Sequence, residues 1–392
     1  MPARPRAKDR DFAVVTTAQF FMAFSLNFLF VFLPFYIQHV STMDAADTLR
    51  WTGLIVGGAS AAATVGSTFW GGLTDRFSPK ALFERGILSH AVLVALMGFT
   101  TDVRLLLLIR LVQGFMGGIS TIGLIIVSAV SQPEELPRRM GAYQSALTLG
   151  QIFSPPLGAL AAAAFGFRGA FLASSSVLFC VFLFSRAGLS HLAPVGRAAR
   201  GEAVPRRQLL LAWSVAFAGT IQIVFLPSVL PEILRGFQVP EARQLLTAGV
   251  IVFAYGVSAA AGSYGFSRLA SRVPARRLLL LAAGGAAGCQ LLLIAGVEPV
   301  SFTLLRMAQT ALAAGIFPLI LAEVAARGRG RTIGFINMAR FAGNAAGPVI
   351  ATFILAHTDL LALYATLAAG LVAPALAQHV ATRGGRPPHP EA

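Results

Sequence analysis

The feature that most constrains the fold is a succession of twelve windows of about 20 apolar residues, separated by short clusters of charge. A bilayer core about 30 Å thick is crossed by about 20 residues of α-helix, so each window can span it. The windows are continuous and do not alternate, which favours helices over a β-barrel. They cover residues 12–38, 51–73, 81–101, 105–131, 140–167, 169–185, 208–231, 244–267, 278–297, 299–322, 332–358 and 360–382. We therefore predict an all-α integral membrane protein with twelve transmembrane helices.

The charge distribution predicts how the chain crosses the membrane. The formal charge of +15 could suggest a nucleic-acid partner. However, most of the 31 basic residues lie in the tails and in alternate loops, on the side that holds the N-terminal tail. The other side holds only Arg50, Arg104, Arg168, Arg235 and Arg243. By the positive-inside rule we predict that both termini are cytoplasmic, and we expect contacts with membrane lipids but no nucleic acid.

The domain boundaries follow from the same windows. The first window is too long for a signal-peptide core, so we expect it to be retained. A Pro- and Gly-containing basic stretch at 186–207 predicts a cytoplasmic linker. The predicted parts are a tail at 1–11, a six-helix bundle at 12–185, the linker, a six-helix bundle at 208–382 and a tail at 383–392. The Ala- and Arg-rich composition favours a bacterial inner membrane.

The two predicted bundles repeat one pattern. Val31-Phe32-Leu33-Pro34 recurs 193 residues later as Val224-Phe225-Leu226-Pro227. The residues that recur at an offset of 196 are Leu73, Arg76, Arg110 and Gln113, as Leu269, Arg272, Arg306 and Gln309. Gly141 and Pro155 recur at an offset of 193 as Gly334 and Pro348. Duplicated halves of an apolar chain are typical of alternating-access transporters, whose binding site lies where the halves meet.

Three motifs resemble those of the major facilitator superfamily. The stretch 71–80, Gly-Gly-Leu-Thr-Asp-Arg-Phe-Ser-Pro-Lys, resembles its GxLxDRxGRK loop. Arg110-Leu111-Val112-Gln113-Gly114 resembles its RxxQG signature, and 150–158 resembles the GxxxGPxxGG signature of its antiporters. The resemblance covers the whole chain. It implies two six-helix bundles around a cavity that opens alternately to each side, without ATP hydrolysis or covalent chemistry. The sequence has no nucleophile and base pair, metal cluster or phosphate-binding loop, so we expect neither enzyme activity nor a cofactor.

The loop motif predicts a latch. A carboxylate at the end of window 51–73 can meet the positive N-terminal end of a helix from the other half. The resemblance implies that the partner of Asp75 lies near Arg331 and Thr332, and that Arg76 belongs to the same gate. In the second half Ser271 replaces the acid, so the latch is expected on one side only. The alternative is that Asp75, Arg76 and Lys80 form a solvated turn.

Glycine and proline predict places where helices bend or approach closely. Pro155-Pro156 and Pro348 remove backbone hydrogen bonds within windows 140–167 and 332–358, so we expect bends there. Small residues four apart predict close helix packing. Such pairs are Gly53 with Gly57, Gly114 with Gly118, and Gly284 with Gly288.

Charged side chains inside the windows are the candidate functional groups, because each costs roughly 2.5 to 3.5 kcal/mol at a helix centre unless it meets a partner or water. Arg110 and Arg306 occupy equivalent positions, so we interpret them first as structural or coupling residues that hydrogen-bond inside each bundle, and second as substrate ligands. Arg340 has Leu147 as its counterpart. This difference between the halves indicates that Arg340 has a function that the first half does not share.

Two polar stripes predict the lining of the cavity. Asn337, Arg340 and Asn344 share one face of their window, and Gln144, Thr148 and Gln151 share the corresponding face of the other half. Asn27 and Gln222 are further candidates. The alternative is that these amides only hold neighbouring helices together.

Two features of the sequence bear on the coupling ion. The antiporter-like signature favours proton antiport, yet no carboxylate lies deep in windows 12–38 or 105–131. Glu84 and Glu323 are the acids nearest the interior, and His90 could titrate near neutral pH, although a lone histidine on an apolar face is usually only packed. Cys180 and Cys289 have neither disulfide nor metal spacing.

The leading hypothesis is a monomeric secondary transporter that exports a small amphipathic or anionic organic compound, with protons as candidate counter-ions. In this hypothesis Arg340 binds an anionic group, and the regions of Pro155 and Pro348 flex. The alternatives are an organic-anion importer or uniporter, a lysolipid or glycolipid translocase, and a non-transporting factor that assembles a membrane complex.

Overall fold

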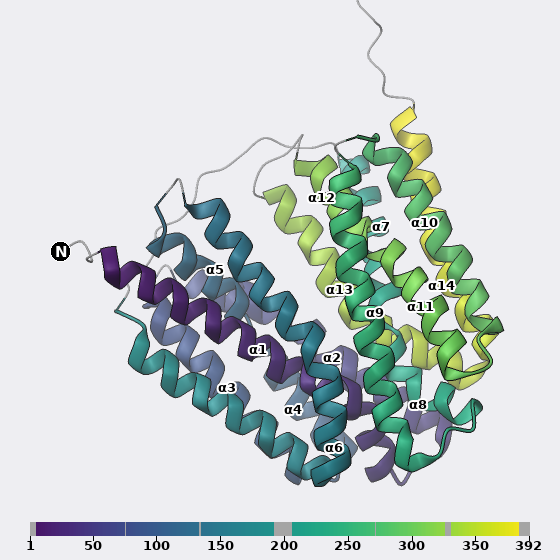
Figure 1. The fold of residues 1–392 in the computed structure, drawn as a ribbon, viewed down its shortest axis with the longest axis horizontal. Coiled ribbons are helices and arrows are strands. Elements are labelled where there is room, and N and C mark those ends of the chain that lie inside the picture. Colours follow the sequence, from purple (N-terminus) through teal and green to yellow (C-terminus); the bar gives the residue numbers. More distant parts are fainter. Residues whose placement is uncertain are drawn as a thin grey trace, which may run out of the picture. The chain divides into compact units, whose positions relative to one another are not determined.

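The computed structural model describes residues 5–74, 76–132, 135–191, 206–270, 272–325 and 331–383. These residues form α-helices joined by short turns, and no strand occurs among them (Figure 1). The helices of the first part of the chain are α1 Pro5–Val40, α2 Ala45–Leu73, α3 Pro79–Phe99, α4 Val103–Phe115, α5 Ile119–Val130 and α6 Leu136–Gly188. Those that follow are α7 Arg206–Val224, α8 Leu226–Gly236, α9 Glu241–Leu269, α10 Ala275–Leu292, the 3-10 turn η1 Leu293–Ala295, α11 Pro299–Ala314, α12 Ile316–Ala325, α13 Arg331–His357 and α14 Leu360–Arg383.

The helices correspond to the predicted windows. Within the described residues, ten helical stretches are long and apolar enough to cross a membrane. One of them, Arg139–Gly188, contains both windows 140–167 and 169–185, and Gly166 inside it has non-helical backbone angles. Window 51–73 lies in the 29-residue helix α2. The prediction of an all-α membrane protein is therefore confirmed.

Three predicted windows are broken helices. Window 105–131 is divided between α4 and α5 at Met116–Gly118, window 208–231 between α7 and α8 at Phe225, and window 299–322 between α11 and α12 at Gly315. The prolines at which we expected bends stay inside helices, Pro155 and Pro156 in α6 and Pro348 in α13. The sequence predicted bends at the prolines, whereas the helices are interrupted at Met116–Gly118, Phe225 and Gly315.

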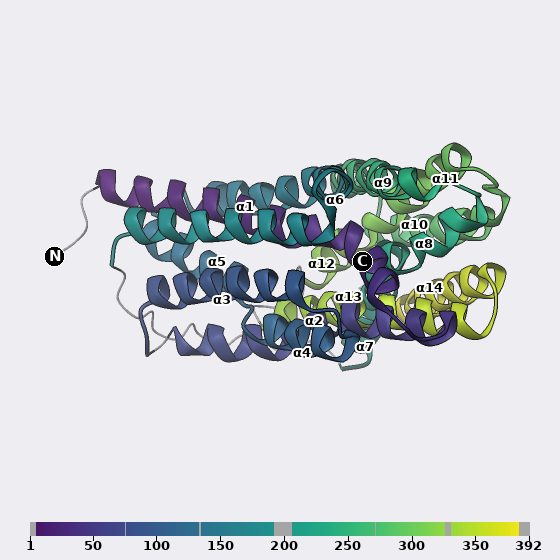
Figure 2. The same ribbon diagram turned by 90° about the horizontal axis from the view of Figure 1, so that it is seen from below.

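The chain forms two compact units. The first contains 1–198 and 227–253, and the second contains 199–226 and 254–392. In the first unit α1 and α3 pack against α6, and α2 packs against α4 (Figure 2). In the second unit α7 packs against α13 and α14, and α10 packs against α11 and α14. The predicted linker lies largely outside the described residues, and the predicted division into six-helix bundles stays a prediction.

Close helix packing repeats at the sequence offset of 196. A Cβ atom added to Gly66 of α2 would lie 2.1 Å from the Phe115 carbonyl oxygen, and one added to Gly262 of α9 would lie 2.0 Å from that of Ala311. Only glycine permits both approaches. By contrast, nothing lies within 4 Å of a Cβ atom at Gly284 or Gly288, so the close packing expected there is wrong.

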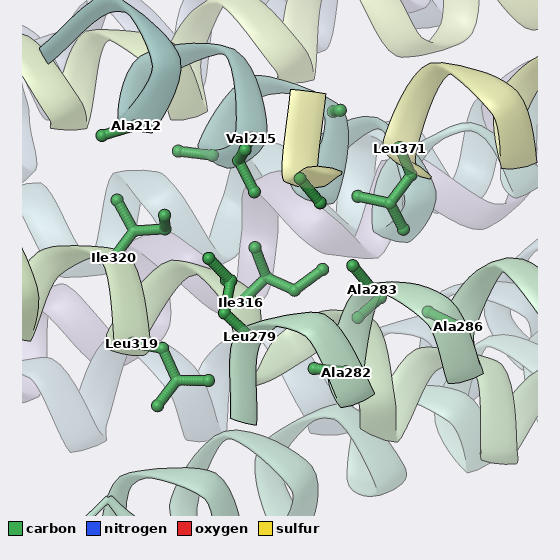
Figure 3. Close-up of a cluster of buried hydrophobic side chains, with 14 of the residues drawn as sticks. Ala212, Val215, Leu279, Ala282, Ala283, Ala286, Ile316, Leu319, Ile320 and Leu371 are labelled. Atoms are coloured by element: carbon green, nitrogen blue, oxygen red, sulfur yellow. The ribbon is translucent and has the colours of Figure 1, made fainter. Parts of the chain in front are cut away.

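The second unit is held by an apolar core. Ala212 of α7, Ile316 of α12 and Ile336 of α13 belong to one buried cluster, which also includes side chains of α10 and α14 (Figure 3). The dominant stabilisation of this cluster is the dispersion attraction of closely packed side chains, because lipid is as apolar as the core.

The equivalent positions of the first unit are polar. Gln19, Ser120 and Tyr143 stand where the second unit has Ala212, Ile316 and Ile336. The Tyr143 hydroxyl donates to Gln19 Oε1 at 2.6 Å, and Gln19 Nε2 donates to Ser120 Oγ at 2.9 Å. Both Gln19 and Tyr143 are buried. Helices α1, α5 and α6 are thus joined by directional bonds, where the second unit relies on packing.

Candidate transport site

Arg306 is the centre of a buried polar network in the second unit. Its Nη1 donates to Gln309 Oε1 at 2.6 Å and to the Gln222 carbonyl at 2.9 Å. Its Nη2 donates to the Ile223 carbonyl at 2.9 Å, and the guanidinium carbon lies 4.8 Å from the ring centroids of both Phe225 and Tyr255. The side chain is fully buried. Its charge is therefore compensated by carbonyl dipoles and aromatic faces.

The network explains the break between α7 and α8. Proline has no N–H, so Pro227 cannot donate to the carbonyl of Ile223 four residues earlier. In a membrane an unsatisfied carbonyl costs several kcal/mol, and Arg306 supplies the missing donor. Gln222 was expected to line the cavity, but it is buried: its Nε2 donates to the Leu367 carbonyl, and its Oε1 accepts from Gln309. That expectation is wrong.

Arg110 occupies the equivalent position of the first unit with fewer contacts. Its Nη1 donates to Gln113 Oε1 at 2.7 Å, and its Nε donates to the Ile55 carbonyl of α2 at 3.3 Å. Leu29 and Ala59 stand where the second unit has Gln222 and Tyr255. The repeated Arg and Gln therefore pair in both units, but only Arg306 holds a broken helix.

The side chains of the polar stripes are more accessible. Gln144, Thr148 and Gln151 are exposed on α6, and within the described residues neither glutamine side chain has a hydrogen-bond partner. These two amides therefore do not hold neighbouring helices together in the described parts.

The stripe on α13 contains a cation that has no carboxylate partner within the described residues. Arg340 is exposed, its guanidinium carbon lies 5.3 Å from the ring centroid of Phe317, and no carboxylate pairs with it in the described parts of the chain. Asn344 is half-buried. Asn27 of α1 donates to the Ala23 carbonyl of its own helix at 2.9 Å, while the side chain of Asn337 lies outside the described residues.

The two candidate coupling residues of α3 have local partners. Glu84 is buried, with Lys80 Nζ at 3.6 Å and Arg186 Nη1 at 3.9 Å from its carboxylate oxygens. His90 is also buried, and its Nδ1 lies 2.9 Å from the Gly86 carbonyl oxygen of the same helix. Glu84 thus belongs to an ion-pair cluster that ties α3 to α6. The side chain of Glu323 lies outside the described residues.

Most side chains of the predicted latch lie outside the described residues. Asp75 and Ser271 lie outside the described residues, as do the side chains of Arg331 and Thr332. Arg76 is exposed in the turn after α2, where its N–H donates to the Leu73 carbonyl.

Two polar clusters of the first unit were not singled out from the sequence. At the end of α1, Gln38 Nε2 donates to Glu232 Oε1 of α8 at 3.0 Å, and Arg235 Nη2 donates to Gln38 Oε1 at 3.1 Å. At the break between α4 and α5, Trp70 and Arg85 contact backbone carbonyls. The signal that could have singled out Arg85 was its position inside window 81–101.

These observations define a helical membrane protein that carries polar residues within its membrane-spanning helices. The sequence profile of the Major Facilitator Superfamily matches residues 15–348. The chain therefore belongs to this family of transporters.

Comparison with individual proteins supports the family. The chain is 23% identical over 385 residues to the multidrug resistance protein MdtG of Proteus mirabilis, covering 93% of this chain and 94% of that one. It is 26% identical over 174 residues to the staphyloferrin B transporter of Staphylococcus aureus, covering 44% of this chain and 42% of the relative. Identity is low in both cases, so the substrates named for these relatives do not transfer directly.

Solved structures share the fold at lower identity. The structure of a bacterial homologue of the human lysosomal transporter Spinster, in an inward-facing and unoccupied conformation, has a TM-score of 0.74 at 15% identity and covers 97% of this chain and 98% of that one. The human organic anion transporter MFSD10 has a TM-score of 0.67 at 18% identity, covering 95% and 99%. At these identities the likeness shows the fold alone.

Proposed function

We propose that this transporter exports a small amphipathic or anionic organic compound across the bacterial inner membrane by alternating access. The observation that carries the proposal is the exposure of Arg340, Gln144 and Gln151 within helical stretches that are long and apolar enough to span a membrane. Side chains of this kind are costly against lipid, so they face water or a polar ligand. The similarity to multidrug resistance proteins over most of the chain supports export.

Arg340 is the proposed contact for an anionic group. A guanidinium carries five N–H donors in a planar fork that matches a carboxylate or sulfonate, and the contact with Phe317 uses none of them. The amides of Asn337, Asn344, Gln144, Gln151 and Asn27 are the proposed hydrogen-bonding groups for the neutral part of the substrate.

The proposed gate consists of Asp75 and Arg76 after α2, with the regions of Pro155 and Pro348 as flexible segments. Pro155 and Pro156 lie beside Gly249 of α9, where an added Cβ atom would come within 3.4 Å of the Pro155 carbonyl oxygen. Arg110, Gln113 and Arg306 are proposed to maintain the bundles during the transition. For a proton-coupled cycle, Glu84 and His90 are the proposed coupling residues of α3.

The test of the binding role is transport of a fluorescent organic anion, carboxyfluorescein, by the purified full-length chain in proteoliposomes. Arg340→Gln should raise the carboxyfluorescein concentration for half-maximal transport about 10- to 100-fold, because a charge-assisted interaction is lost. The matched control is Arg277→Gln, which also removes one positive charge but from an exposed position at the start of α10. Unchanged transport by Arg340→Gln at normal membrane abundance would refute the role of Arg340, and failure of the unmodified protein to move any of a diverse set of compounds would refute export itself.

A uniporter of organic anions is the second candidate. It is favoured by the place of Glu84, because this acid lies near the start of α3 in a cluster with Lys80 and Arg186 and not deep in the span. Carboxyfluorescein counterflow with and without an imposed pH gradient separates the two functions. Export by proton antiport requires accumulation against a concentration gradient when the pH gradient is present, whereas a uniporter only equilibrates the compound.

A further inference from the structure

The break between α4 and α5 differs in kind from its counterpart between α11 and α12. In the first unit, Gly118 has a φ angle of 84°, and residues Met116–Gly118 leave the helical path. In the second unit, Gly315 keeps near-helical angles of −70° and −22°, and the N–H of Leu319 still donates to the Gly315 carbonyl. The first-unit break therefore turns the chain out of the helical path, whereas the second-unit break keeps near-helical backbone angles.

The carbonyls of Phe115 and Met116 are among those that the interruption leaves without a helical donor. In a continuous helix the carbonyls of Phe115 and Met116 would accept from the N–H groups of residues 119 and 120. Trp70 Nε1 of α2 instead donates to the Phe115 carbonyl at 2.8 Å, and Arg85 Nη2 of α3 approaches the Met116 carbonyl at 3.4 Å. Because this break lies within the candidate span Val103–Val130, unsatisfied carbonyls there would be costly.

Arg85 and Trp70 also contact each other. The guanidinium carbon of Arg85 lies 3.4 Å from the centroid of the Trp70 ring, and Arg85 Nη1 lies 3.1 Å from the Met116 sulfur. Each side chain thus restrains the other against the break. At the equivalent positions, 196 residues later, the second unit has Phe266 and Leu281, which offer no side-chain donor. Side-chain donors thus contact the first-unit break, and the second unit lacks them at the equivalent positions.

The helices on either side of the break have different attachments. Arg110 connects α4 to the Ile55 carbonyl of α2, and a Cβ atom on Gly114 would lie 2.0 Å from the Ala59 carbonyl oxygen, so α4 follows α2. On the other side, Ser120 Oγ of α5 accepts from Gln19 of α1, and the Tyr143 hydroxyl of α6 lies 3.1 Å from the Ser120 carbonyl oxygen. A change in the angle at the break would therefore move α2 relative to α1 and α6.

We propose that this break is a hinge of the first unit, and that Arg85 and Trp70 are the positioning residues that set its geometry. Broken helices with left-handed glycine and capped carbonyls are suited to this task, since a few residues absorb the change in backbone angles while both flanking helices stay intact. Gln19 and Tyr143 hold α5 on one side of the break, and Arg110 holds α4 on the other. Each flanking helix therefore moves together with the helices to which it is bonded.

The experiment compares variants of the full-length protein in nanodiscs by hydrogen–deuterium exchange of the segment 113–123. Arg85→Leu, which installs the second-unit residue, should raise exchange in this segment about tenfold because a capped carbonyl loses its donor. Arg85→Lys, which keeps the charge and one donor, should stay within about threefold of the unmodified protein. Trp70→Phe keeps a ring but removes the N–H, so its effect should lie between the two.

A second readout separates a hinge from mere structural support. In a background without Cys180 and Cys289, Thr148→Cys places a thiol on the exposed face of α6, and its labelling rate by a maleimide reports opening. If the break is a hinge, Arg85→Leu changes this rate about threefold or more, and Arg85→Lys restores it. The control Leu281→Ala alters an exposed side chain and should change neither readout.

Two results would overturn the proposal. One is a lower unfolding temperature in Arg85→Leu with an unchanged thiol labelling rate, which would make Arg85 a structural residue only. The other is unchanged exchange in segment 113–123 for both Arg85→Leu and Trp70→Phe. If Arg85→Leu does not reach the membrane, Trp70→Phe replaces it in both measurements, with Arg85→Lys as the variant that should stay close to the unmodified protein. Neither readout needs a substrate, so this test is independent of the proposed export.

Discussion

The guanidinium of Arg306 donates at 2.9 Å to the carbonyl of Ile223, the carbonyl that Pro227 deprives of its helical donor. Arg306 and Arg110 occupy equivalent positions of the repeat, but only Arg306 donates to a carbonyl at the break between α7 and α8. Arg110 donates to a carbonyl of the neighbouring helix α2 instead.

Replacing Arg306 should destabilise the protein strongly. Arg306→Leu leaves the carbonyls of Gln222 and Ile223 buried without a donor, so we expect a loss of about 2 to 5 kcal/mol in the free energy of unfolding. Arg110→Leu frees one carbonyl beside a less buried side chain and should cost less. Thermal unfolding of both variants in the same detergent checks the order, and equal losses would contradict the capping role.

The polar seam of the first unit can be tested through Tyr143. Tyr143→Phe removes one hydroxyl and leaves Gln19 Oε1 buried without its donor, which should cost about 1 to 3 kcal/mol. Adding Gln19→Leu removes that orphaned acceptor, so the double variant should be less destabilised than the sum of the two single variants. The same unfolding measurement gives the coupling free energy between Tyr143 and Gln19, and strict additivity would show that the bond contributes nothing.

In the second unit, Ile336→Val should lower the free energy of unfolding by only about 0.5 to 1.5 kcal/mol, because packing is the sole contribution of this side chain.

Close backbone approaches predict where added volume is not tolerated. Gly66→Ala and Gly262→Ala each place a methyl group about 2 Å from a carbonyl oxygen, so the helices must separate. We expect both variants to reduce the amount of folded protein in membranes severalfold. Gly284→Ala is the matched control because its Cβ atom meets nothing within 4 Å. Fluorescence-detected size-exclusion chromatography of the three proteins gives the comparison, and normal yields of Gly66→Ala would mean that the contact is looser than the structure shows.

The latch proposed for Asp75 predicts an asymmetric response. Asp75→Asn removes the carboxylate that would meet the helix N-terminus near Arg331, so the side predicted to be cytoplasmic should open more often. Ser271→Ala, at the equivalent position of the second half, should have no such effect. Maleimide labelling of Thr148→Cys from either side of the membrane measures the shift. A response of equal size in both variants would argue against a latch on one side only.

The sequence specified the class of fold because membrane insertion depends on local properties. Windows of about 20 apolar residues predict spanning helices without knowledge of their neighbours, and α1, α3 and α14 lie where windows 12–38, 81–101 and 360–382 place them. The offsets of 193 and 196 also gave the equivalences between halves, and the approaches at Gly66 and Gly262 follow them. Motifs such as the one at 71–80 then indicated the family.

The roles of individual polar residues required the tertiary structure, because a side chain of one type can cap a carbonyl, pair with another helix or face water. Gln222 and Gln151 are both amides in predicted windows, yet one is buried in the Arg306 network and the other is exposed. Arg85 reads as one more basic residue near a loop, and only the path of α4 shows that it contacts a broken helix. The sequence by itself determined that the chain spans a membrane as a duplicated helical protein, since burial in lipid is decided within each segment. Tertiary structure decided which segments break and which side chains satisfy the breaks, since those donors come from helices distant in the chain.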